Sequence, residues 1–241
     1  MKKEKIKTVA VWVFVILICA LYVKVALADP TGATINSNST DTGPTITPGN
    51  LTNDRGTITT IVLQAMQQDQ HWKGYVGNVT GALSLRDSNQ ETLYDWTNLA
   101  SPSGEVYATR SSSLSFSSVQ CAQAGTITTE ETFNNMTGTD ADSISNTFNE
   151  TDHTAMTIAG TTVNSCPYAS MYVSSTSQGQ DSNDDFQEIL VEDASANLMY
   201  VSQINDDTTG FNSNSYDFQM IVGESDVKTT PTTFYFYVEL S

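Results

Sequence analysis

The sequence predicts a mainly β protein, a β-sandwich of the immunoglobulin-like or jelly-roll type with a short helical insert. Thr, Ser and Asn make up about a third of the 241 residues, and these residues favour strands and loops over helix interiors. Short apolar runs separated by Gly, Asn, Asp and Ser recur after residue 57, which is typical of closely spaced strands. With 39% hydrophobic residues, the chain is long and apolar enough for one domain with a buried core.

Residues 1–28 have the three-part order of a secretory signal peptide. Residues 1–7 are basic, residues 8–23 are apolar, and Ala26 and Ala28 are the small residues that precede cleavage before Asp29. The alternative is an uncleaved anchor, the one way in which we expect this chain to contact a membrane. The apolar run spans roughly 24 Å as a helix, shorter than the ~30 Å hydrocarbon core, which favours cleavage. We therefore expect an extracellular or cell-surface location.

The charge balance excludes nucleic acid as a partner. The whole chain carries 10 Lys and Arg against 27 Asp and Glu, a net charge of −17. A surface that binds nucleic acid needs a basic patch, which so few bases do not supply. Removal of residues 1–28 leaves 5 basic and 26 acidic side chains, a net charge of −21. Such an acidic surface favours a soluble exported domain whose copies repel one another.

Residues 29–56 are expected to form a flexible, polar N-terminal segment, because they hold three of the six prolines and have almost no apolar periodicity. The sandwich domain then covers residues 57–241. Its first candidate strand is residues 57–66, and residues 71–85 form a long β stretch that bends at Gly77 or Gly81. Residues 86–91 are turn material, and residues 92–96 return as a hairpin partner.

Further strands follow at the short spacing of a sandwich. The candidates are residues 105–110, 113–121, 169–174, 186–193, 198–204, 216–222 and 233–240. Between the two later cysteines, capping residues precede acids, which predicts one or two short helices inserted at about residues 128–150. The last strand alternates aromatic and aliphatic residues. We expect it inside the sandwich or paired with another chain, because an open edge of this kind promotes aggregation.

Two kinds of covalent site are predicted after residue 28. Cys121 and Cys166 are the cysteines that remain, and in an exported chain the pair predicts one disulfide. Neither has the neighbouring ligands of a metal site. Five Asn-x-Ser/Thr sequons predict glycan acceptors on exposed loops or strand faces. They are Asn38, Asn50, Asn78, Asn135 and Asn149.

No catalytic residue and no cofactor are predicted. The chain lacks a Gly-x-Ser-x-Gly elbow, a P-loop and a dinucleotide fingerprint. Its two histidines have the contexts of a strand end (His71) and a solvated loop (His153). No dedicated metal site is expected, although Asp181, Asn183 and Asp185 place oxygen ligands at alternate positions and remain candidates for a loop-bound calcium ion.

Several segments together resemble a group of archaeal exported cell-surface proteins that has no established activity. These segments are residues 72–81, 93–96, 104–108, 216–222 and 234–240. The resemblance covers most of residues 57–241. It implies an archaeal host and a surface location, and it carries over no functional residue.

These observations favour a secreted, glycosylated structural or adhesive protein of the cell surface, such as a filament or envelope subunit. Its partners would be its own copies or other envelope proteins, and in one version residues 29–56 or the C-terminal strand complete a neighbour's sheet. The alternative is an extracellular module that binds carbohydrate or protein. In that case Trp72, Trp96 or Tyr107 would stack on sugar rings, unless they pack in the core. A hydrolase with acidic catalytic residues is a third class.

Overall fold

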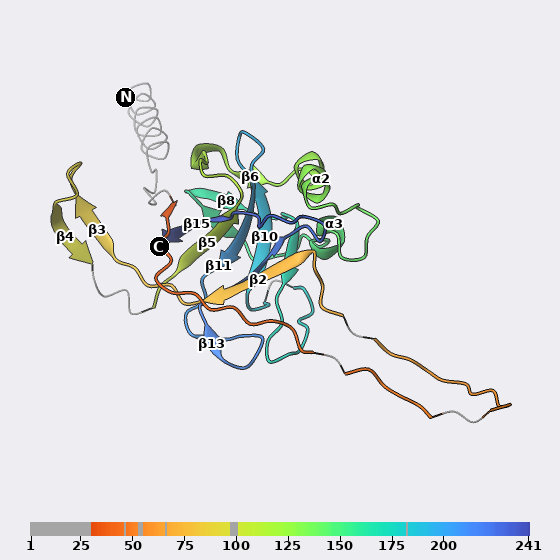
Figure 1. Ribbon diagram of the computed structural model, residues 1–241. Coiled ribbons are helices and arrows are strands. Elements are labelled where there is room, and N and C mark those ends of the chain that lie inside the picture. The colour runs from red at the N-terminus through yellow and green to blue at the C-terminus, as the bar shows by residue number, and fades with distance from the viewer. Residues whose placement is uncertain (1–29, 46, 53–54, 66, 97–100, 182) are drawn as a thin grey trace, which may run out of the picture.

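The computed structural model describes residues 30–45, 47–52, 55–65, 67–96, 101–181 and 183–241. The predicted signal peptide, with its cleavage position between Ala28 and Asp29, lies outside these residues. Within them the fold is mainly β, with antiparallel sheets and two short α-helices, so the predicted mainly β class is confirmed (Figure 1). No helix in this part of the chain has the length and apolar character to cross a membrane.

A seven-stranded antiparallel sheet forms the centre of the domain. Its strands lie in the order β1 (Thr31–Gly32), β15 (Tyr235–Leu240), β5 (Gly104–Thr109), β11 (Leu198–Gln203), β10 (Gln187–Glu192) and β6 (Gln120–Cys121), with β9 (Tyr168–Ser170) also paired to β10. The C-terminal strand β15 pairs with β5 over its whole length and with β1 on its other side. The ladder with β1 contains only Tyr237 and Val238 of β15, so this apolar strand lies within the sheet, one of the two predicted alternatives, and the short β1 covers part of its outer edge.

The central strands β5, β10 and β11 are buried on both faces, although several of their inward side chains, such as Glu105 and Glu188, are polar or charged. On β5, Val106 and Ala108 contribute to one hydrophobic cluster. Tyr107 lies between them in the sequence and points into a second cluster on the opposite face. The core is therefore divided by the sheet into two halves, and each half needs its own cover.

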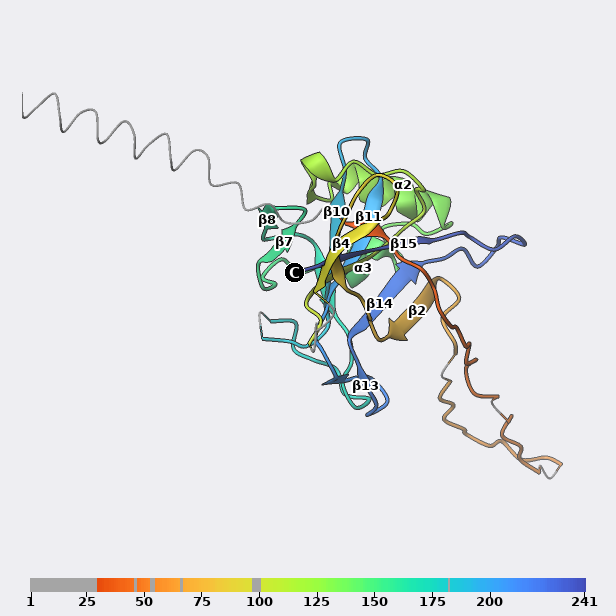
Figure 2. The ribbon, with the colours of Figure 1, turned by 90° about the vertical axis from the view of Figure 1, so that its left-hand side faces the viewer.

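Different elements cover the two faces. One face is covered by α2 (Ala124–Phe133), α3 (Ile144–Thr147) and the two-stranded sheet of β2 (Trp72–Gly77) and β14 (Phe218–Gly223). The other is covered by the hairpin of β7 (Met156–Ile158) and β8 (Thr161–Val163) and by the 3-10 turn η1 (Phe116–Ser118). Figure 2 shows β7 and β8 to the left of the central strands and β2 and β14 to their right.

Two further two-stranded sheets complete the described structure. They are β3 (Leu83–Arg86) with β4 (Thr92–Trp96), and β12 (Thr208–Thr209) with β13 (Ser215–Tyr216). The long β stretch predicted over residues 71–85 is instead two strands in different sheets: β2 ends at Gly77, one of the two predicted bend positions, and β3 pairs with β4 in the predicted hairpin. Its turn is held by Asp87, whose Oδ1 accepts the backbone N–H groups of Asn89 and Glu91, both at 2.9 Å.

Two predicted strands are wrong. Of the strand predicted over residues 57–66, the described residues 57–65 form no strand, because they join none of the backbone ladders of the described structure. Residues 113–121 form η1 and only the two-residue β6. Here the backbone N–H of Ser115 donates to Asp193 Oδ2 at 3.1 Å rather than to a neighbouring strand. The hairpin β7–β8 was not predicted, since an alternation of three residues is too short to recognise.

The helical insert is present with shifted bounds. Helix α2 begins at Ala124, before the predicted start at residue 128, and has no side-chain cap. Helix α3 has a cap: Ser143 Oγ accepts the backbone N–H of Asn146 at 3.2 Å. Both helices pack through buried side chains such as Ile127 and Ile144, so tertiary contacts as well as capping determine where they lie.

Candidate functional site

An extended segment projects from the domain between β1 and β2. We call residues 34–70 the arm; Figure 1 shows it running away from the body and back to β2. Its described apolar side chains are exposed, among them Ile58 (101%), Val62 (95%) and Leu63 (83%). Large apolar side chains gathered in one exposed segment mark a surface that interacts with something else.

A second apolar projection lies on the other side of the body. The β3–β4 hairpin stands apart from the central sheet, away from the tip of the arm (Figure 1). Leu93, Tyr94 and Trp96 on β4 are 80%, 60% and 53% exposed. The Tyr94 and Trp96 rings meet edge to face with centroids 5.0 Å apart. A two-stranded hairpin is marginally stable in water by itself, so this exposed one is suited to receiving a further partner.

At the base of the arm, a histidine lies among three aspartates. His71 Nδ1 lies 2.7 Å from Asp142 Oδ2, and Nε2 lies 3.4 Å from Asp226 Oδ1. Asp69 Oδ1 accepts the backbone N–H of His71 at 2.7 Å. The hydrogen bond to Asp142 is the main cause that raises the pKa of His71, and the same bond lowers the pKa of Asp142. The imidazole is thus held in a strongly acidic environment.

Sequence reasoning found only part of this group. His71 does stand at a strand end, directly before β2, as predicted. Its partners Asp142 and Asp226 come from the loop before α3 and from the segment after β14, far along the chain. The one signal visible in the sequence is Asp69, two positions before the histidine.

A second acidic pair is buried in the central sheet. Glu105 on β5 lies directly opposite Glu239 on β15. Glu239 Oε2 accepts two hydrogen bonds, from Tyr107 Oη at 2.8 Å and from the backbone N–H of Ala159 at 2.9 Å. Burial, with the Glu239 charge as a smaller cause, raises the pKa of Glu105 to about 8. The arrangement keeps Glu105 protonated near neutral pH beside a hydrogen-bonded carboxylate.

A cleft of about 270 Å³ lies elsewhere on the surface, lined by residues 78–81, 102, 206, 207 and 217. Asp217, a buried residue of the lining, accepts a backbone N–H group on each of its carboxylate oxygens. Its Oδ2 accepts the N–H of Val79 at 2.6 Å and its Oδ1 that of Asp207 at 3.0 Å. Asp217 therefore fixes the loops around the cleft. Glu105 and Glu239 do not line this cleft.

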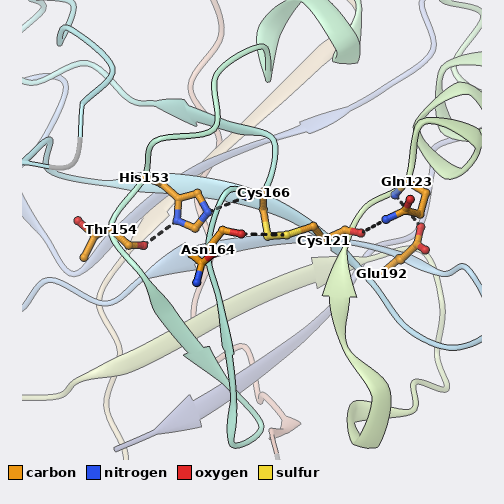
Figure 3. Close-up of a disulfide and its surroundings, with 7 residues drawn as sticks. All are labelled: Cys121, Gln123, His153, Thr154, Asn164, Cys166 and Glu192. Atoms are coloured by element: carbon orange, nitrogen blue, oxygen red, sulfur yellow. Dashed lines mark hydrogen bonds between the residues drawn. A yellow bond between two sulfur atoms is a disulfide. The ribbon is translucent and has the colours of Figure 1, made fainter.

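The predicted disulfide is present. Cys121 on β6 and Cys166 before β9 are bonded, with Cα atoms 4.8 Å apart (Figure 3). His153 lies beside the bond and is buried, so its prediction as a solvated loop residue is wrong. Its Nε2 accepts the backbone N–H of Cys166 at 2.9 Å, and its Nδ1 donates to the Thr154 carbonyl at 2.6 Å. Burial lowers the pKa of His153, which favours this neutral tautomer.

All five sequon asparagines are exposed in the structure. Asn38 and Asn50 lie on the arm, Asn78 follows β2, and Asn135 follows α2. Asn149, the fifth, follows α3. At Asn135 the attachment atom Nδ2 donates to Asp226 Oδ1 at 3.4 Å. Glycosylation at these exposed positions stays a prediction.

The calcium candidates lie in a turn before β10. Asp181 Oδ1 accepts the backbone N–H of Asn183 at 2.7 Å. The Asp185 backbone N–H donates to Gln178 Oε1 at 3.0 Å. These contacts give the turn a structural explanation without an ion. Among the described residues, the one group of metal-ligating side chains that come together is Asp69, His71 and Asp142.

The three aromatic residues that were candidates for sugar stacking differ in how far their rings are exposed. Tyr107 is fully buried. Trp72 packs against the core and donates from Nε1 to the Asp142 carbonyl at 2.8 Å. Of these three residues, Trp96 alone presents an exposed ring, beside Tyr94.

Comparisons with protein families, with curated proteins and with solved structures found no match to this chain. The geometry of the chain itself is therefore the basis for a functional proposal.

Proposed function

We propose that this chain is an exported structural subunit of the cell surface that assembles head to tail. The arm of one copy docks on the β3–β4 hairpin of the next. The observation that carries the proposal is the pair of apolar projections on different sides of the body: the arm with Ile58, Val62 and Leu63, and the hairpin with Tyr94 and Trp96.

The two projections are complementary in backbone as well as in side chains. Residues 58–63 belong to no helix or sheet, and the β3–β4 sheet has only two strands. Addition of a strand satisfies backbone groups on both partners, and alternate apolar side chains then fill the facing surface. In this proposal the donor segment is residues 57–63 rather than 29–56, and the C-terminal strand is already occupied by β5 and β1.

Charge also supports this contact. Outside the N-terminal 28 residues the chain carries 5 basic and 26 acidic side chains, so copies repel one another over most of their surface. Residues 56–68 contain no charged side chain at all. The arm is therefore a segment that approaches a second acidic copy with little electrostatic cost. Because donor and acceptor are different surfaces, the contact is heterologous and repeats into a filament unless it closes into a ring.

The proposal includes export through residues 1–28, surface location, an archaeal host and glycans on the five exposed asparagines. The disulfide supports export, since such bonds persist in oxidising compartments.

The proposal also includes a fold type, a sandwich of the immunoglobulin-like or jelly-roll type. In that description the β2–β14 sheet, packed on one face of the central sheet, belongs to the second layer.

The first test is the assembly state of the exported protein. We expect sedimentation velocity to show species larger than the monomer and electron microscopy to show linear particles. Ile58→Asp with Val62→Asp should abolish assembly, because two charges would be buried at the contact. Thr59→Asp adds a charge at an exposed polar position on the opposite face of the same segment and serves as the matched control, which we expect to disturb assembly less. A wild-type protein that stays monomeric at every concentration contradicts the proposal.

A mixing experiment tests the head-to-tail arrangement directly. A hairpin variant, Tyr94→Ser with Trp96→Ser, keeps its arm, and the arm variant keeps its hairpin. Each should be monomeric alone, and an equimolar mixture should form a discrete dimer and nothing longer. Dimers formed by the hairpin variant alone would instead indicate contact between two arms. Melting temperatures should change little, because all four substituted side chains are exposed.

Carbohydrate binding is the second candidate, favoured by the exposed rings of Tyr94 and Trp96. A glycan array with the arm variant, which leaves the hairpin free, is the matching test. Binding that disappears in the Tyr94→Ser, Trp96→Ser variant would assign the hairpin to a sugar rather than to a neighbouring arm.

A further inference from the structure

The acidic group at the base of the arm combines the donors of a metal site. One ligand atom each from Asp69, His71 and Asp142 can be chosen so that all three lie within 4.8 Å of one another. In the described part of the chain, the ion pairs of Asp142 and Asp226 are with His71 alone. Three carboxylates therefore surround a single imidazole, and their negative charge exceeds what one imidazole can balance.

The far side of the imidazole provides an independent observation. His71 Nε2 is buried and has no hydrogen-bond partner of adequate geometry. The nearest opposite charge is Asp226 Oδ1, 3.4 Å away. An imidazole that binds a metal through one nitrogen donates its other N–H to a carboxylate, which fixes the tautomer and the ring orientation. Asp226 stands where that carboxylate is required if Nδ1 is the ligand.

We propose that Asp69, His71 Nδ1 and Asp142 bind a divalent cation of the zinc class, with Asp226 as the carboxylate that orients His71. The cation takes the place of the proton shared between Nδ1 and Asp142. A set of one imidazole nitrogen and two carboxylate oxygens suits Zn²⁺, Co²⁺, Ni²⁺ or Mn²⁺, whereas Ca²⁺ and Mg²⁺ prefer oxygen ligands throughout. Asp69 is exposed, which leaves the ion a path from solvent.

The ligands come from different parts of the molecule. Asp69 belongs to the arm, His71 directly precedes β2, and Asp142 lies in the loop before α3. That loop is held against β2 by the Trp72 indole, which donates to the Asp142 carbonyl at 2.8 Å. A bound cation would therefore tie the end of the arm to the body. Binding of the ion itself does not depend on the proposed assembly.

The test uses the exported protein freed of metal with a chelator and then titrated with Co²⁺ and Zn²⁺. We expect one equivalent of Co²⁺ with visible d–d absorption, displaced by Zn²⁺ and retained in millimolar Ca²⁺. Asp69→Asn and His71→Asn should each weaken Zn²⁺ binding at least tenfold, and Asp226→Asn should weaken it by about tenfold as an orienting group. Asp41→Asn, an exposed aspartate on the arm, is the control and should bind as the wild type does.

Two results would overturn the site. One is the absence of saturable Co²⁺ or Zn²⁺ binding by the wild-type protein. The other is binding that Asp69→Asn and His71→Asn leave unchanged, since that would place the ion on another acidic surface. Circular dichroism of the metal-free variants separates loss of ligands from loss of fold, and the exposed Asp69 is the substitution that should leave the fold intact.

Discussion

At the scale of single residues, the most unusual groups are carboxyls buried inside a very acidic protein. Glu105 faces Glu239 across β5 and β15, and burial raises its pKa to about 8. Glu188 on β10 is completely buried, and burial raises its pKa as well. One oxygen of Glu188 accepts the backbone N–H of Ile221 at 2.8 Å, and the other has no partner. Burial therefore favours the protonated form of both carboxyls in the folded state.

This protonation makes stability depend on pH with a definite sign. A carboxyl whose folded pKa lies above its unfolded value near 4.5 holds its proton more tightly in the folded state. Its contribution to the free energy of unfolding is complete below pH 4.5 and is lost as pH rises to about 8. We expect Glu105→Gln to raise the free energy of unfolding at pH 8 by about 1–3 kcal/mol, with a smaller gain at pH 5.

Urea denaturation at several pH values measures this effect. Glu91→Gln, in the exposed turn of the β3–β4 hairpin, removes the same charge at an exposed position and serves as the matched control. The slope that remains in Glu105→Gln is expected from the other groups with shifted pKa values, among them Glu188, His71 and His153. A Glu105→Gln variant that is less stable than the wild type at pH 8 would show that the ionised pair is favourable.

Residue roles differed in how far the sequence could reveal them. The Cys121–Cys166 bond was predictable because only two cysteines follow the predicted signal peptide. His153 was not, because its burial depends on packing beside a bond that closes thirteen residues further on. The contacts of His71 with Asp142 and Asp226 could not be predicted either, since a single sequence does not show which distant aspartates lie beside a given side chain.

At the scale of elements, the disulfide encloses some of the elements that cover each face of the sheet. Helices α2 and α3 and the β7–β8 hairpin all lie between Cys121 and Cys166. These elements are short, and α2 has no side-chain cap. The bond therefore restricts a segment whose own secondary structure is of low intrinsic stability.

Removal of the bond should be costly. For the 45-residue separation, the chain-entropy model gives about 3–4 kcal/mol of stability lost in Cys121→Ser with Cys166→Ser. We expect reductant to lower the urea midpoint of the wild type to a similar extent and to leave the double variant unaffected. Equal midpoints for the oxidised wild type and the double variant would indicate that packing alone holds the insert.

Element prediction succeeded where the partner strand was close in sequence or burial was unavoidable. The β3–β4 hairpin has its turn residues between its strands, and β15 is too apolar to remain outside the sheet. Residues 57–65 show why composition and periodicity alone do not suffice to predict a strand. Their β-branched and apolar composition favours a strand, but a strand also needs a neighbour, and periodicity within one segment does not show whether the fold provides one.

At the scale of the whole molecule, net charge opposes any contact between copies. A charge of −21 on residues 29–241 makes repulsion long-ranged at low ionic strength. Raising the salt concentration from about 0.01 M to 0.1 M shortens the Debye length from ~30 Å to ~10 Å. We therefore expect salt to strengthen head-to-tail assembly, measured as a lower dissociation constant in sedimentation experiments.

The arm variant Ile58→Asp with Val62→Asp provides the control for this salt effect, because it should remain monomeric over the whole range. Assembly that weakens as salt is added would contradict the expectation. It would mean that opposite charges, rather than apolar side chains and strand pairing, hold the copies together.

The placement of arm and hairpin on different sides of the body also gives any chain of such subunits a direction. One terminal subunit would present an unused arm, and the other an unused hairpin. The two ends then have different chemistry, so addition of subunits proceeds at two different rates, and a growing fibre on a cell would have a distinct base and tip. A subunit lacking its arm would block further growth at only one of them.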